Sequence, residues 1–69
     1  MTPKEFRTIR SRLNLSAREM GVALGLHGDP GRTVRRYEAG DVDISGPVQT
    51  SMLAFKDGFR PPWYPKEKE

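Results

Sequence analysis

Cysteine is absent from the 69 residues, and the chain has a single histidine. The lack of cysteine excludes a disulfide framework and a thiolate zinc site, because both need paired thiols. His27 has no second histidine or cysteine with which to share a metal ion, so we expect it to be an exposed turn residue. The composition therefore predicts no metal site.

Long apolar runs are absent as well. No stretch approaches the roughly 20 apolar residues that a membrane helix needs. The segment MTPKEFRTIR carries charges where a signal peptide would have its apolar core. We expect a cytoplasmic protein that does not attach to a membrane.

Sequence signatures of catalysis are also lacking. There is no G-x-S-x-G motif around a serine nucleophile. Three closely spaced glycines suggest a phosphate-binding loop, but the Walker pattern fails because Leu26 occupies its first glycine position and Arg32 replaces its lysine. These glycines are better explained as turn and cap residues. We expect neither enzymatic activity nor a cofactor.

What the chain does contain is a set of helix-start signals. Thr2 with Glu5, and Ser16 with Glu19, have the spacing of capping boxes, and apolar residues follow each at helical intervals. Gly21, inside the second of these segments, costs about 1 kcal/mol relative to alanine and indicates close approach by another backbone. The expected helices cover residues 3–13 and 17–24.

Two further helices follow along the chain. Asp29 is a suitable N-cap with proline at the next position, which predicts a helix over residues 30–39 that ends at Gly40. A last helix is expected to open at residues 45–47 and to end at Gly58. Its expected buried side consists of Val48, Met52, Leu53 and Phe55.

These segments predict one all-α domain, a compact bundle of four or at most five short helices over residues 1–58. Residues 59–69, FRPPWYPKEKE, are rich in proline and end in alternating charges, so we expect an extended or disordered tail. Its aromatic residues can dock on the domain's own core or on a protein partner. They are Phe59, Trp63 and Tyr64.

Positive charge is concentrated in the first half of the chain. Residues 1–36 have a net charge of +5, whereas the remainder has −2. Three arginines lie on the expected 30–39 helix, and a small core cannot bury them unpaired. A helix, a turn and a basic second helix predict a helix-turn-helix, whose second helix enters the major groove of DNA.

The segments RSRLNLSAREMGVALGL and RTVRRYEAG resemble the Cro/CI-type (XRE-like) helix-turn-helix regulators of phages and bacteria, over about residues 3–55. The resemblance implies a structural ion pair between Arg10 and Glu38, outside the DNA contact set. It also implies that a phosphate lies at the start of the second helix. The implied DNA-contacting positions are Arg32, Thr33, Arg35, Arg36, Ala17, Arg18 and Gly31.

Three features depart from the family pattern. Ala17 stands where relatives often have a glutamine that touches DNA. The turn before Thr33 is about three residues longer than usual, and Gly31 stands where a base-contacting side chain is common. Asp41 and Asp43 follow the basic helix and would repel phosphates at close range.

We therefore expect a sequence-specific regulator of double-stranded DNA, a phage or bacterial repressor that blocks polymerase. A single module buries only about 600–1,000 Å², so we expect a homodimer on a palindromic site, joined through the last helix and the tail. Two alternatives stay open. One is a protein-interaction module on the same scaffold, such as an antitoxin or a phage protein that binds a host factor. The other is a non-specific architectural DNA binder.

Overall fold

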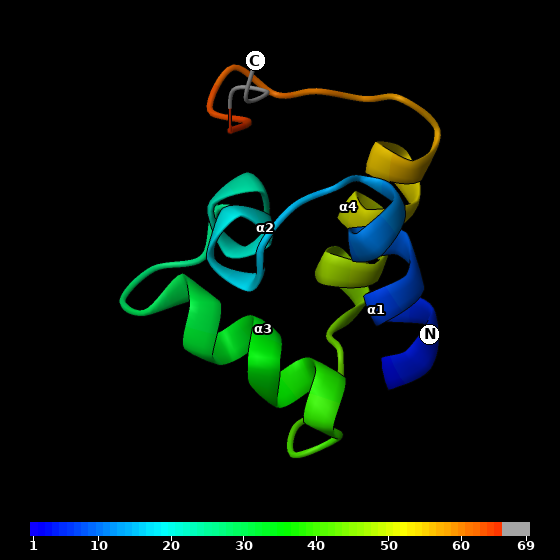
Figure 1. Cartoon of the computed structure of the whole chain (residues 1–69), viewed down its shortest axis with the longest axis vertical. Coiled ribbons are helices and arrows are strands. Elements are labelled where there is room, and N and C mark those ends of the chain that lie inside the picture. Colours follow the sequence, from blue (N-terminus) through cyan, green and yellow to red (C-terminus); the bar gives the residue numbers. More distant parts are fainter. Residues whose placement is uncertain (66–69) are drawn as a thin grey trace.

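A computed structural model describes residues 1–65, which form four helices and no strand (Figure 1). This confirms the expected all-α bundle. None of the helices in this range is long and apolar enough to cross a membrane. The last four residues of the expected tail, 66–69, lie outside the described part. The helices are α1 (Pro3–Arg12), α2 (Ala17–Ala23), α3 (Pro30–Ala39) and α4 (Gly46–Lys56).

The helix starts follow the predicted caps. The Thr2 hydroxyl accepts the backbone N–H of Glu5, and the Ser16 hydroxyl accepts that of Glu19. Each glutamate carboxylate in turn accepts the backbone N–H of its cap residue, so both capping boxes are complete. The first two helices end one residue earlier than predicted. The α3 helix has the predicted bounds and ends at Gly40, whose φ of 78° is left-handed.

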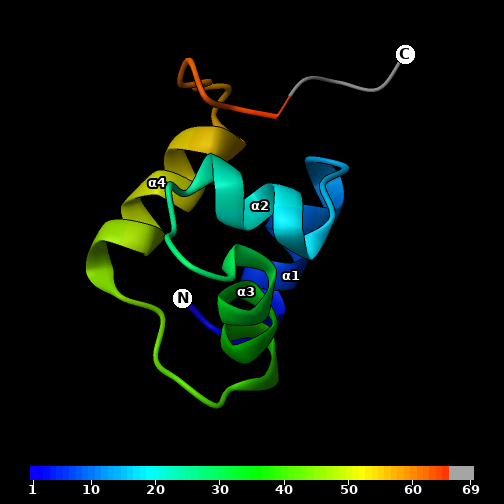
Figure 2. The ribbon, with the colours of Figure 1, turned by 90° about the vertical axis from the view of Figure 1, so that its left-hand side faces the viewer.

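The four helices enclose one apolar core. The α2 helix packs mainly on α3, and α1 packs on both α3 and α4 (Figures 1 and 2). Each helix contributes through residues three or four positions apart, as expected for a single buried face. The buried apolar residues are Phe6, Ile9, Met20, Ala23, Val34, Tyr37, Ile44, Val48, Met52 and Phe55.

The prediction that Leu53 is buried was wrong, because its side chain is 50% exposed. Val48, Met52 and Phe55 lie four and three positions apart and define the buried face of α4. Leu53 directly follows Met52, and one residue turns a helix by about 100°. The side chain of Leu53 therefore points away from the core.

The described part of the tail folds back on the domain, so that of the open alternatives its aromatic residues follow the one in which they dock on the domain itself. The Tyr64 ring meets Phe55 edge-on, with 5.6 Å between centroids. The indole N–H of Trp63 donates to the carbonyl oxygen of Ala23 at 3.0 Å. In both views the tail runs from the end of α4 across to α2 (Figures 1 and 2). These contacts join the C-terminal ends of the two helices.

Candidate nucleic-acid interface

The α2 and α3 helices meet at a glycine. A Cβ atom added to Gly21 would lie 2.5 Å from both the Cβ and the carbonyl oxygen of Pro30, the first residue of α3. Such contacts are far below van der Waals distance, so only glycine lets the two helices approach this closely. The close backbone approach that Gly21 predicts is therefore present, and it places the start of α3 against the middle of α2.

Gly31, one of the positions at which the resemblance implies DNA contact, is buried between Arg18 of α2 and Arg35 of α3. A Cβ at this position would lie 3.3 Å from the Cα of Arg18 in α2 and 3.1 Å from Nη1 of Arg35. The lack of a side chain instead makes room for the α2 backbone and for the guanidinium group of Arg35. The same contacts bring Arg18 next to the first turn of α3.

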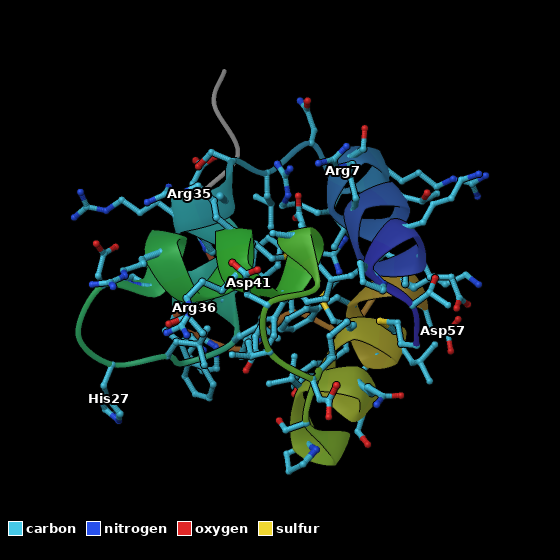
Figure 3. The ribbon with its side chains drawn as sticks, turned by 90° about the horizontal axis from the view of Figure 1, so that it is seen from below. Arg7, His27, Arg35, Arg36, Asp41 and Asp57 are labelled. Atoms are coloured by element: carbon cyan, nitrogen blue, oxygen red, sulfur yellow. The ribbon has the colours of Figure 1, made fainter. Side chains whose placement is uncertain are left out.

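The arginines of α3 project from its exposed face. At about 100° per residue, Arg32, Arg35 and Arg36 span an arc of roughly 100°, opposite the buried Val34 and Tyr37. All three are exposed, and Figure 3 shows Arg35 and Arg36 on α3 as it faces the viewer. Within residues 1–65, no hydrogen bond or ion pair engages these guanidinium groups. We call Arg18, Arg32, Arg35 and Arg36 the basic face.

The other positions predicted to contact DNA are partly buried or already hydrogen-bonded within the protein. Thr33 is half-buried, and its hydroxyl donates to the carbonyl oxygen of Asp29 at 3.4 Å. Ala17 packs partly against the core. At the start of α2 the capping box already bonds the N–H groups of Ser16 and Glu19, so these two donors do not face a phosphate. The basic side chains thus remain the main candidates for contact.

Arg10 and Glu38 form the ion pair that the resemblance implies. Two parallel hydrogen bonds link them: Arg10 Nε donates to Glu38 Oε2 at 2.5 Å, and Nη2 donates to Oε1 at 2.8 Å. Arg10 Nη1 also donates to the carbonyl oxygen of Leu15 at 3.1 Å. The hydrogen bond with Glu38 raises the pKa of Arg10 above its ordinary value. Arg10 therefore joins α1, the α1–α2 connection and the end of α3.

A second arginine, which the sequence pattern did not predict, lies at this pair. Arg7 Nε lies 3.5 Å from Glu38 Oε1, and its side chain is 68% exposed. Arg7 and Arg10 are three positions apart and share one side of α1. The spacing alone indicates that both arginines project from the same side of α1. That Glu38 lies on this side can be seen only in the folded chain.

Negative charge lies at the C-terminal end of α3. Asp41 and Asp43 follow this helix and are both exposed. Figure 3 shows Asp41 on the side of the molecule that carries Arg35 and Arg36. Because these carboxylates would repel phosphates, the N-terminal half of α3 is better suited to approach DNA than its end.

No family model, curated protein or solved structure matches this chain. Within residues 1–65 no three histidine, cysteine or acidic side chains come together as a metal site would require. The basic face remains the strongest concentration of unpaired charge on α2 and α3, and it is suited to a polyanion.

Proposed function

We propose that this protein is a sequence-specific, DNA-binding transcriptional regulator that acts in the cytoplasm and places α3 in the major groove. The observation that supports this proposal is the basic face, which has four exposed arginines on two helices held in close contact at Gly21 and Gly31. The major groove is about 12 Å wide, and a helix with its side chains is about 10–12 Å across.

Within this proposal the arginines have different roles. Arg32 lies in the middle of the exposed arc of α3 and in its first turn, from which recognition helices contact bases. Its guanidinium group donates to O6 and N7 of guanine. Arg18 lies on α2, at the edge of the basic face, and contacts a phosphate. Arg10 and Glu38 do not contact DNA but hold α3 in its orientation.

The protein binds DNA as a homodimer in this proposal, since one module makes too few contacts for selective binding. Phe59 and Trp63 are 58% and 59% exposed although the tail is folded back, and such aromatic surface is enriched in protein interfaces. We place the dimer contact there. Two half-sites about one helical turn apart then follow from the two-fold symmetry.

Selection from random duplexes tests the proposal, with fluorescence anisotropy measured at low and at physiological salt. We expect enrichment of a palindrome, and loss of binding when Arg32, Arg35 and Arg36 are replaced by alanine. The matched control removes three positive charges elsewhere, through Lys4→Ala, Arg12→Ala and Lys56→Ala. It should retain the enriched sequence.

The other outcomes identify the alternatives. Salt-dependent binding without enrichment, lost equally in both triple variants, indicates an architectural DNA binder. The absence of binding at low salt excludes DNA recognition by this chain. In that case the acidic loop of Asp41 and Asp43 and the exposed aromatic residues favour a protein partner.

A further inference from the structure

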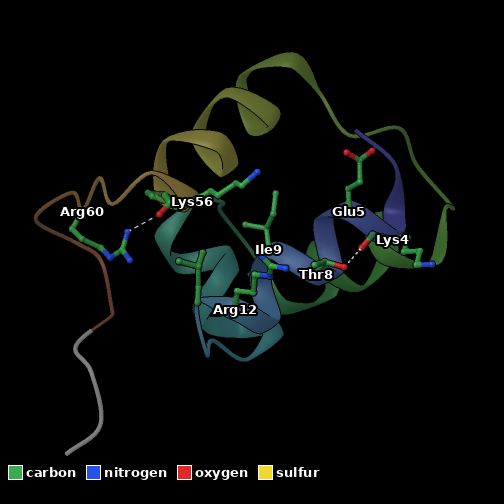
Figure 4. Close-up of a pocket in the computed structure, with 9 residues that line it drawn as sticks. Lys4, Glu5, Thr8, Ile9, Arg12, Lys56 and Arg60 are labelled. Atoms are coloured by element: carbon green, nitrogen blue, oxygen red, sulfur yellow. Dashed lines mark hydrogen bonds between the residues drawn. The ribbon is translucent and has the colours of Figure 1, made fainter.

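A groove of about 630 Å³ lies between α1 and the end of α4 (Figure 4). Its floor is apolar and consists of Ile9, Leu13 and Phe55, which we call the apolar floor. Charged side chains from both helices and from the tail surround this floor. Volumes of about 300–1,000 Å³ are typical of sites for small organic ligands.

The groove lies on the side of α1 that faces away from α3. Glu5 and Arg12 line the groove, and they lie about 140–160° around the α1 axis from Arg7 and Arg10. The latter two arginines reach Glu38 of α3. A ligand in the groove would therefore leave the basic face uncovered, and the groove is a separate feature from the proposed DNA interface.

Positive charge is concentrated at one end of the groove. Lys4 lies at the other end, next to Glu5, whereas Arg12, Lys56 and Arg60 lie towards the ends of α1 and α4 (Figure 4). A single charged end beside an apolar floor suits a molecule with one anionic group. A nucleic acid or a polyacidic segment would instead require positive charge along the whole groove.

Two of these three cations have no hydrogen-bond or ion-pair partner among the described residues, although the charge of Lys56 acts on the Glu5 carboxylate and helps to lower its pKa. Arg60 is engaged, since its Nη1 donates to the carbonyl oxygens of Phe55 and Phe59 and its guanidinium group lies over the Tyr64 ring. For Arg12 and Lys56 there is no hydrogen bond or ion pair to any described residue. Both side chains are exposed. Arg12 and Lys56 lie in the last turns of α1 and α4, where their positive charges interact favourably with the helix dipoles. This interaction does not use their N–H donors.

We propose that this groove binds a small organic anion that carries one anionic group on an apolar body. The anionic group lies between Arg12 and Lys56, which supply charge-assisted hydrogen bonds. The apolar body packs on the apolar floor, where Ile9 and Phe55 are already buried in the core and the half-buried Leu13 provides most of the surface that the ligand removes from water. This proposal does not depend on the proposed DNA binding.

A pair of fluorescent probes tests the proposal. 8-Anilinonaphthalene-1-sulfonate is the anionic probe, and N-phenyl-1-naphthylamine has the same rings without the charge. We expect the folded protein to bind the anionic probe about ten-fold more tightly. The preference should disappear in the variant Arg12→Met/Lys56→Met. The control variant Arg35→Met/Arg36→Met removes the same charge from α3 and should keep the preference.

Equal affinity for the two probes, or an equal loss in both variants, would overturn the proposal. Amide chemical shifts of the unsubstituted protein provide a second measurement that does not depend on any variant. With the anionic probe we expect the largest changes in residues 9–13 and 54–60. Changes centred on α3, or on the exposed Trp63 ring alone, would contradict the assigned site. The same spectra recorded with duplex DNA report separately on α3.

Discussion

The indole N–H of Trp63 donates to the carbonyl oxygen of Ala23, which lies forty positions earlier in the chain. Ala23 is the last residue of α2, and the final carbonyls of a helix have no partner within it. The N–H groups of Leu24, Gly25 and Leu26 bond the carbonyls before Ala23, so this one is left for the tail. The hydrogen bond therefore completes the C-terminal end of α2 from the far end of the chain.

Replacing Trp63 by phenylalanine should lower the free energy of unfolding by about 1 kcal/mol, because the ring remains but the donor is lost. Urea unfolding followed by circular dichroism measures this, since the variant loses the chain's single tryptophan. Lys56→Gln is the control, because Lys56 is exposed and should change stability by less than about 0.5 kcal/mol. Equal stability of Trp63→Phe and the parent would show that the tail contact is not stabilising.

Gly21→Ala should destabilise the fold although alanine is the better helix former. The new Cβ would lie 2.5 Å from Pro30 backbone and side-chain atoms, and the resulting shift of α3 should cost about 1–3 kcal/mol. Gly46→Ala is the matched control, because nothing lies within 4 Å of its added Cβ. That change should be neutral or slightly stabilising. Comparable unfolding midpoints for the two variants would contradict close packing of α2 on α3.

Removing Arg10 should be far more damaging than removing Arg7. The Glu38 side chain is 6% exposed, so Arg10→Met leaves a nearly buried carboxylate without its main partner and should cost about 3 kcal/mol. Arg7 is largely exposed and lies 3.5 Å away, so Arg7→Met should cost less than about 0.5 kcal/mol. A double-mutant cycle with Glu38→Met gives the coupling energy. A cycle that closes with no coupling would reject the structural role of the pair.

The capping box of α1 predicts a pH effect. The backbone N–H of Thr2 hydrogen-bonds the Glu5 carboxylate and lowers its pKa below 4.5. Glu5 therefore stabilises the folded chain at pH values above 4.5, and this contribution is lost as the pH falls through the lower folded pKa. At about pH 7 the Glu5→Gln variant should have a lower melting temperature than the parent, and this difference in melting temperature should disappear in acid. Thermal unfolding of both proteins from about pH 7 to acidic pH tests this prediction. A difference in melting temperature that persists at low pH would refute it.

Helix starts could be predicted from sequence because the bonds that define them are local. Each capping box joins residues three positions apart, and Asp29 likewise accepts the N–H of Arg32. Gly21 was also informative, since a glycine inside a helix has a cost that a tertiary contact explains. These features require no knowledge of the rest of the fold.

The sequence was less informative where distant segments decide the surroundings of a residue. Gly31 stands at a position where the resemblance implies DNA contact, and its burial could not be foreseen because it depends on Arg18 of a different helix. For the tail, the sequence left open whether its aromatic residues dock on the domain or on a partner, and only the fold shows that Trp63 and Tyr64 have partners on α2 and α4. The groove between α1 and α4 was missed for the same reason, because its cations are far apart in the sequence.

Single arginine substitutions should separate base contacts from phosphate contacts. If Arg18 contacts a phosphate, Arg18→Ala should weaken binding to all duplexes alike and reduce the slope of log K against log salt by about 1. If Arg32 contacts a guanine, Arg32→Ala should cost about 1–3 kcal/mol on the selected duplex and much less on random DNA. Anisotropy titrations at several salt concentrations measure both quantities. An Arg32→Ala variant that loses affinity equally on selected and random duplexes would place this arginine on the phosphate backbone, and would favour architectural binding over sequence-specific regulation.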